Sequence, residues 1–241
     1  MTRRFYLEPG EFDDGEVRLG GARARRLVNV LRLRAGAELR VFDGLGGERV
    51  ALVQDSGRAS ATLTLGEAVQ PLEEPPVAVT LVCAFPRGAR GDWIVEKTTE
   101  LGVARIVPLR AQRSVLAPGD SRLARWRRVA VEAAEQCGRA VVPEIGGEPP
   151  GGALELVAAA AGVAGISQAL DGVTAAAVVL YVGPEGDWSD QELEAHRAAG
   201  RIAVSLGPRT LRVETAAVIG AAQVLEATGG LMAPPRPRPT A

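Results

Sequence analysis

Two Gly-Pro turns are the residues of this chain most able to form a small-molecule site. The first, Gly183-Pro184-Glu185-Gly186, follows an apolar run at 178–182, and the second, Gly207-Pro208, follows a shorter run at 202–206. Each turn therefore stands between a predicted strand and a predicted helix. In an open α/β sheet, ligands bind just beyond the carboxyl ends of the strands. The turns lack the spacing of a G-x-G-x-x-G dinucleotide loop and the Lys-Ser/Thr of a P-loop, so they predict a ligand site without specifying its ligand.

Local signals predict the elements that position these turns. The run at 178–182 is apolar throughout, as in a strand buried on both faces of a parallel sheet. Ser189 and Glu192 have the spacing of a capping box, which predicts a helix that starts there and ends near Gly200. A helix of small residues is predicted from near Thr215 to about Thr228.

The other residues from 77 onward also alternate between predicted strands and helices. Strands are predicted at 77–83, 105–109 and 163–170, and helices at 91–102, 121–138 and 154–161. This alternation indicates parallel βαβ units and therefore an α/β fold for residues 77–228. The proline-rich tail at 229–241 is expected to be disordered.

The first 70 residues predict a small β-rich domain. Strands are expected at 16–19, 37–42, 49–53 and 59–65, with a helix at 22–33. Arginines recur from Arg23 to Arg34 without an intervening acid, and charge alone leaves two interpretations open. The stretch is either a solvated helix face or a patch that binds phosphate. A proline-stiffened linker at 71–76 separates this domain from the next.

Composition excludes several classes of protein. The net charge of −1 argues against a chain that coats nucleic acid nonspecifically, although it allows a local basic patch. Two cysteines and one histidine cannot build a cysteine-histidine zinc cluster, so no metal is expected. Cys83 and Cys137 are expected to be small buried thiols of a cytoplasmic protein, and His196 a surface residue. Neither a signal peptide nor a membrane-spanning run is predicted.

The chain resembles the RsmE family over most of its length. The first Gly-Pro turn and the run Leu-Gly-Pro-Arg-Thr-Leu-Arg-Val-Glu-Thr-Ala at 206–216 resemble that family's two characteristic loops. Residues 96–103 resemble its K-x-x-E-L-G-V helix, Arg113-Ser114 its R-S pair, and 132–139 its E-x-x-E-Q-x-x-R helix. Asp187 stands where the family usually has glycine, and it places a charge beside the expected cofactor loop.

The resemblance implies a fold, a cofactor and a reaction. RsmE proteins are SPOUT methyltransferases that methylate N3 of a uridine in 16S ribosomal RNA of the small ribosomal subunit. The implied fold is an N-terminal PUA-like β-barrel, which binds RNA, and a C-terminal α/β domain whose deep trefoil knot binds S-adenosylmethionine. A homodimer is also implied. The cofactor walls are expected after 163–170, at 182–188 and at 206–211. The residues expected at the cofactor are Leu170, Val182, Gly183, Pro184, Glu185, Gly186, Leu206, Gly207, Pro208 and Leu211.

Two residues after the second turn are the candidates for the chemistry of this reaction. Uracil N3 carries a proton that must be removed, or the resulting anion stabilised, before methylation. With the resemblance, Arg212 is expected to stabilise the anion or position the base, and Glu214 to accept the proton or hold Arg212. The alternative is that Arg212 and Glu214 only pair with each other structurally.

The resemblance also favours phosphate binding by the basic stretch. The residues expected to contact RNA are Arg3, Arg4, Arg25, Arg26, Arg32, Arg113 and Arg139. Two other functions remain open from the sequence. One is a SPOUT enzyme that acts on another base or on transfer RNA, and the other is a noncatalytic RNA-binding ribosome assembly factor. The N-terminal matches argue against the first, and Asp187 in the cofactor loop is the feature that could support the second.

Overall fold

The computed structural model describes residues 3–13, 15–57, 59–113, 118–160, 162 and 164–231. The predicted disordered tail lies outside these residues from 232 onward. The chain forms two compact units. The N-terminal unit runs to Glu73 and also includes Ala134–Val142, and the C-terminal unit contains Glu74–Ala133 and the chain from Pro143 onward.

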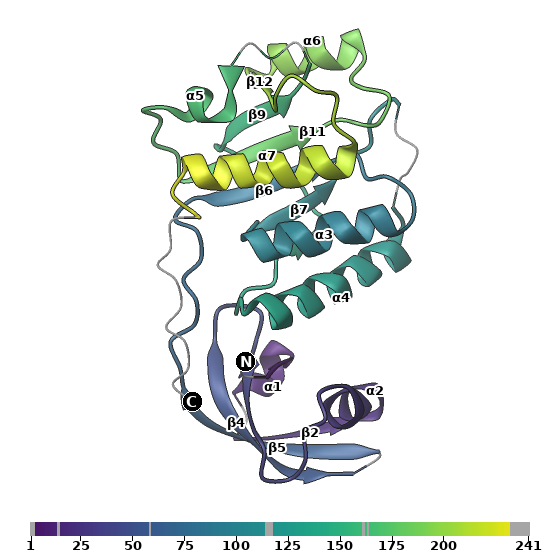
Figure 1. The fold of residues 1–241 in the computed structure, drawn as a ribbon, viewed down its shortest axis with the longest axis vertical. Coiled ribbons are helices and arrows are strands. Elements are labelled where there is room, and N and C mark those ends of the chain that lie inside the picture. The colour runs from purple at the N-terminus through teal and green to yellow at the C-terminus, as the bar shows by residue number, and fades with distance from the viewer. Residues whose placement is uncertain are drawn as a thin grey trace. The chain divides into compact units, whose positions relative to one another are not determined.

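A five-stranded mixed sheet forms the N-terminal unit, in the order β1-β3-β4-β5-β2. Figure 1 labels β2, β4 and β5 of this sheet. β1 and β3 are parallel, and the other pairs are antiparallel. The predicted helix at 22–33 is shorter than expected and ends in a wider π-helical turn, η1. The elements are β1 (Arg4–Tyr6), α1 (Pro9–Phe12), β2 (Glu16–Gly20), α2 (Gly21–Arg25), η1 (Arg26–Val30), β3 (Glu38–Phe42), β4 (Glu48–Ser56) and β5 (Ser60–Ala68).

The core of this unit follows from the alternation of its strands. Val17 and Leu19 on β2, and Leu63 on β5, point to one side and are at most 3% exposed. Leu27 on η1 packs into the same apolar cluster and is fully buried. Burial of such side chains is the main stabilising term for a sheet with one solvated face.

A seven-stranded parallel sheet forms the C-terminal unit, in the order β10-β12-β9-β11-β6-β7-β8. α3 and α7 lie side by side over one face, with α7 in front of β6 and β11 (Figure 1). The strands are β6 (Ala78–Cys83), β7 (Arg105–Pro108), β8 (Glu144–Ile145), β9 (Leu154–Ala158), β10 (Ala164–Gly165), β11 (Ala177–Val182) and β12 (Ile202–Ser205). The helices are α3 (Ala89–Leu101), α4 (Asp120–Cys137), α5 (Ile166–Leu170), α6 (Asp190–Ala198) and α7 (Val213–Ala227).

The central strand confirms the prediction for residues 178–182. β11 pairs in parallel with both β9 and β6, and from Val178 to Val182 it is at most 5% exposed. The capping box before α6 is also confirmed, because the Ser189 hydroxyl accepts from the Glu192 amide while the Glu192 carboxylate accepts from the Ser189 amide. Gly200 follows α6 with φ 74°, as expected for a glycine that ends a helix.

Two predicted elements are wrong. The alanine-rich segment at 154–161 was predicted to be a helix, but residues 154–158 form β9, which pairs with both β11 and β12. Burial of Leu156 and Val157 between neighbouring strands outweighs the helix propensity of the alanines. The segment at 163–170 was predicted to be a strand, and its described part is instead the two-residue β10 followed by α5.

Candidate functional site

A cavity of about 400 Å³ opens at the carboxyl ends of three parallel strands in the C-terminal unit. Its walls follow β9, β11 and β12, and the start of α7 also borders it. This is the location at which ligands bind in open α/β sheets. The lining residues are Ala158–Ala160, Val182–Glu185, Asp187, Ser205–Leu211, Val213 and Ala216.

Both Gly-Pro turns contribute to the cavity, so the structure brings the two predicted loops together. Eight of the ten residues expected at the cofactor line it, and the exceptions are Leu170 and Gly186. Leu170 is buried at the end of α5, and the wall expected after 163–170 is provided by the segment after β9. This wall was not predicted, because the residues that lead into it were expected to form a helix rather than the end of a strand.

Trp188 contacts two of the cavity walls and supports them. Its indole Nε1 donates to the Ala158 carbonyl at 2.8 Å, and its ring lies against Gly183. A Cβ on Gly183 would stand 2.8 Å from Trp188 Cε2, which is closer than real Cβ contacts, so only glycine fits beside this ring. The cavity wall therefore depends on the absence of a side chain at residue 183.

His196 lies under this tryptophan, contrary to the prediction that it is a surface residue. It is 7% exposed, and its ring meets Trp188 edge-on at 4.5 Å between centroids. Arg201 donates to its Nδ1 at 3.0 Å and also to the Tyr181 hydroxyl. Burial, followed by the positive charge of Arg201, lowers the pKa of His196, so the neutral ring is favoured.

Asp187 adopts a conformation that explains why a glycine could occupy its position. Its φ is 59°, in the left-handed region that aspartate tolerates better than most residues. Its carboxylate accepts from the Trp188 amide at 2.8 Å, which satisfies one of its oxygens locally. The side chain lines the cavity without disrupting the turn.

Arg212 and Glu214 occupy the start of α7, beside the cavity. Arg212 is the N-cap residue, and Glu214 lies in the first helical turn, where the helix dipole favours a carboxylate. Glu214 is 14% exposed and forms an ion pair with Arg90 rather than the expected alternative pair with Arg212. Its Oε2 is buried and accepts no hydrogen bond from the part of the chain that the structure describes.

Cys83 lies near this carboxylate at the end of β6 and is fully buried. Burial, and then the negative charge of Glu214, raise the pKa of its thiol. The group therefore remains a neutral thiol at neutral pH and is a poor nucleophile.

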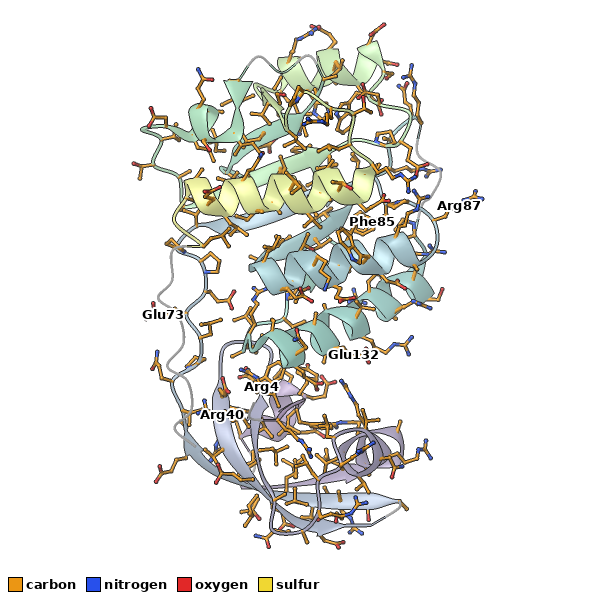
Figure 2. The ribbon with its side chains drawn as sticks, viewed as in Figure 1. Arg4, Arg40, Glu73, Phe85, Arg87 and Glu132 are labelled. Carbon is orange, nitrogen blue, oxygen red and sulfur yellow. The ribbon has the colours of Figure 1, made fainter. Side chains whose placement is uncertain are left out.

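Several predicted RNA-binding arginines make contacts within the N-terminal unit. Arg4 and Arg40 both face the buried carboxylate of Glu48, at 3.3 and 3.5 Å, and Figure 2 labels the two arginines. Arg4 also donates to the carbonyls of Gly138 and Arg139. The Arg139 side chain itself is only 2% exposed.

Two arginines of the basic stretch that were predicted to contact RNA are open to solvent. Arg25 and Arg32 are exposed, whereas Arg26 forms an ion pair with Glu135, whose side chain is 7% exposed. Arg3 is also exposed and donates to the Leu31 carbonyl. The exposed members of the basic stretch are therefore the ones whose charge can reach a phosphate group.

Arg113, the remaining predicted RNA contact, belongs to the C-terminal unit and lies beside the first Gly-Pro turn. Its Nη1 donates to the Gly186 carbonyl at 2.8 Å, and its aliphatic chain lies against that glycine. In the part of the chain that the structure describes, no group of three histidines, cysteines or carboxylates could hold a metal ion. No helix among the described residues is long and apolar enough to span a membrane.

Comparison with known proteins assigns a class to this arrangement. Residues 73–225 match the RNA methyltransferase domain family, and residues 19–66 match the RNA methyltransferase PUA domain family. The chain is thus an RNA methyltransferase with a PUA domain.

Individual relatives narrow the class. A ribosomal RNA small subunit methyltransferase E from Synechocystis is 34% identical over 238 residues, which cover 93% of this chain and 77% of the relative. The protein of that name from Mycobacterium tuberculosis is 34% identical over 82% of each chain. The crystal structure of a Neisseria gonorrhoeae ribosomal RNA small subunit methyltransferase E bound to S-adenosyl methionine superposes with a TM-score of 0.82. The two chains are 31% identical, and the match covers 92% of this chain and 96% of the other. The chain belongs to the RsmE family.

Proposed function

We propose that this protein transfers a methyl group from S-adenosylmethionine to N3 of a specific uridine in 16S ribosomal RNA of the small ribosomal subunit. One observation carries the proposal: both Gly-Pro turns line a single cavity, and the helix that borders it begins with Arg212 and Glu214. Family membership supports the reaction, because the relatives are named as methyltransferases of small-subunit ribosomal RNA.

The cavity fits this cofactor in size and chemistry. Its volume of about 400 Å³ lies within the usual range for small-molecule sites. Val182, Leu206 and Leu211 supply apolar surface for a nucleobase, and the two turns supply backbone groups for its polar edge. Gly207 has φ 123° and open space where a Cβ would stand, so the backbone can approach a ligand there. When bound, the cofactor supplies the methyl group as an electrophilic carbon on a sulfonium.

The residues at the start of α7 supply the proton chemistry. Glu214 accepts the proton of uracil N3 on its carboxylate, and this frees the N3 lone pair. Arg212 stabilises the negative charge that develops on the uracil oxygens. A uridine in paired RNA must leave its stack to reach these groups.

RNA binding is assigned to exposed arginines of both units. Arg3, Arg25 and Arg32 offer charge from the N-terminal unit, and Arg113 does so beside the first Gly-Pro turn. Phosphate contacts of this kind hold the RNA in register and carry little sequence information. The other three predicted contacts, Arg4, Arg26 and Arg139, act first within the N-terminal unit.

Three further properties of the family belong to the proposal: a deep trefoil knot around the cofactor, a homodimer, and a location in the cytoplasm. The small residues of α7 do not by themselves argue for the dimer, since a Cβ on Gly220 would stand 2.7 Å from Leu180 of the same unit. Ile219 on α7 is 41% exposed and is a better candidate for a contact with a second copy.

Mass spectrometry of the RNA product tests the proposal directly. Purified protein is incubated with S-adenosylmethionine and small subunits from a strain that lacks the endogenous methyltransferase. One N3-methyluridine in 16S RNA is the expected product. Methylation of another base or of transfer RNA would refute the assigned substrate. Tight subunit binding without any methyl transfer would favour a noncatalytic assembly factor.

A further inference from the structure

Arg90 joins α3 to two segments that border the cavity. It lies in the first turn of α3, and its Nη1 is 2.5 Å from Glu185 Oε1 and 3.7 Å from Glu214 Oε2. Glu185 belongs to the turn after β11 and lines the cavity, whereas Glu214 belongs to the first turn of α7. A single guanidinium therefore connects α3, a cofactor wall and the carboxylate assigned to proton transfer.

The two contacts of Arg90 differ in a way that suits a positioning role. The short pair with Glu185 holds the guanidinium in place, with both side chains less than half exposed, at 41% and 44%. The longer contact with Glu214 attracts that carboxylate without using up its oxygen, because Oε2 accepts no hydrogen bond from the described residues. A buried polar atom left without a hydrogen bond is costly in a folded protein and calls for a functional explanation.

Stability alone does not explain the arrangement. Ion pairs between exposed side chains contribute little to folding, and the pair of Arg90 and Glu185 is of that kind. α3 and α7 pack against each other independently of this contact. The position of Arg90 matters most for where the Glu214 carboxylate points.

We infer that Arg90 is a positioning residue for methyl transfer. It holds the Glu214 carboxylate beside the cavity, with Oε2 free of hydrogen bonds from the described residues, and it makes that position depend on the cofactor wall through Glu185. The inference rests on the proposed function and adds to it a residue that contacts neither the RNA base nor the cofactor. Loss of Arg90 then reduces turnover rather than binding.

Turnover and cofactor affinity of Arg90→Gln test the inference. Under saturating RNA and cofactor, its kcat should fall by about 10-fold or more, which is part of the 10²- to 10⁴-fold effect of a general base. The dissociation constant for S-adenosylmethionine, measured by calorimetry, and the melting temperature should remain those of the wild type. Arg90→Lys should restore most of the rate, since an ammonium also attracts both carboxylates.

Asp92→Asn is the matched control, because it breaks another ion pair of α3, the one with Arg125 at 2.6 Å, and neither residue lines the cavity. Its kcat should equal that of the wild type. In a Glu214→Gln background, Arg90→Gln should cause no further loss, as expected for two residues that act as one unit.

Different results identify different failures. An equal fractional loss from Arg90→Gln in both backgrounds, or wild-type kcat in Arg90→Gln, would overturn the positioning role while leaving the proposed function intact. A loss of cofactor affinity or melting temperature that accounts for the fall in rate would make Arg90 a structural residue. Absence of N3 methylation by the wild-type protein would overturn both the proposed function and the role of Arg90.

Discussion

The contact between Gly183 and Trp188 gives a prediction whose size follows from the structure. In Gly183→Ala, the new Cβ would lie 2.8 Å from Trp188 Cε2, 3.0 Å from Nε1 and 3.1 Å from Cδ2. The indole cannot easily move away, because it is 5% exposed, bonded to the Ala158 carbonyl and packed on His196. Either the ring shifts and loses that hydrogen bond, or the wall at residue 183 moves into the cavity.

Overpacking of a buried site by one methyl group costs about 1–3 kcal/mol. In a domain of 150–250 residues, each kcal/mol lowers the melting temperature by roughly 2–4 °C, so a fall of about 2–12 °C is expected. If the cavity wall absorbs the strain instead, the same free energy weakens S-adenosylmethionine binding by about 5- to 150-fold. The strain therefore appears in the melting temperature, in the affinity, or in both.

Calorimetry measures both quantities on the same samples. Gly151→Ala is the control, since a Cβ at that glycine meets no atom within 4 Å. A second change, Trp188→Leu, removes the indole ring, so Gly183→Ala should cause a smaller loss in that background than beside Trp188. Equal melting temperatures and affinities for Gly183→Ala and Gly151→Ala would refute the claim that Trp188 braces the cavity.

Four other perturbations separate chemistry, RNA binding and folding. Arg212→Ala should lower kcat by about 10²- to 10³-fold with little change in cofactor affinity, because it removes an interaction made mainly in the transition state. Glu214→Gln should regain activity as pH rises if Glu214 is the base, since spontaneous ionisation of uracil then replaces it. Arg25→Glu with Arg32→Glu should weaken binding to the small subunit and reduce the salt dependence of that binding, measured by filter binding at several salt concentrations. Finally, the free energy of unfolding should fall as pH drops below about 6.5, because the unfolded chain then binds a proton that buried His196 resists.

Each of these predictions has a result that contradicts it. Wild-type kcat in Arg212→Ala, or a rate defect in Glu214→Gln that is the same at every pH, would remove the assigned roles in proton transfer. An unchanged salt dependence would make the basic stretch a solvated face. For the pH dependence, His196→Asn should show a smaller fall in stability below pH of about 6.5 in denaturant titrations, and an equal fall would assign the effect to other groups.

Local sequence patterns were enough to predict the elements whose hydrophobic pattern and capping residues agree with the fold. The buried strand at 178–182 and the capping box of Ser189 and Glu192 need no distant information, and both were predicted. β9 could not be predicted in the same way, because its alanines favour a helix and only pairing with β11 and β12 makes it a strand. His196 was missed for a related reason, since Trp188 and Tyr181 bury it from outside its own helix.

The parts of the candidate site that have a local sequence signal were predicted, and the parts that depend on distant residues were not. The Gly-Pro turns were predicted because glycine and proline mark turns wherever they occur, and their shared location follows from the parallel sheet. The sequence around Arg90 does not indicate a role for it. Its role depends on contacts with Glu185 and Glu214, which lie far from it in the sequence. The cavity wall after β9 was not predicted, because β9 itself was not predicted to be a strand.

The parallel sheet also has a consequence for how the protein is made. β6 pairs with β11, so Val79 has no partner on that side during synthesis until Val178 has emerged. β9 likewise lacks the neighbour on its outer side until β12 has been made. Sheets built from such distant pairs fold slowly, because the chain loses conformational entropy before the strand pairing contributes stabilising free energy. In the proposed function this cavity holds the cofactor, and its lining includes residues 205–211, 213 and 216, so a growing chain would bind the cofactor only after nearly all of the C-terminal unit has been translated. A ligand that binds only the folded state then stabilises the newly completed sheet, which links the supply of S-adenosylmethionine to the yield of folded protein.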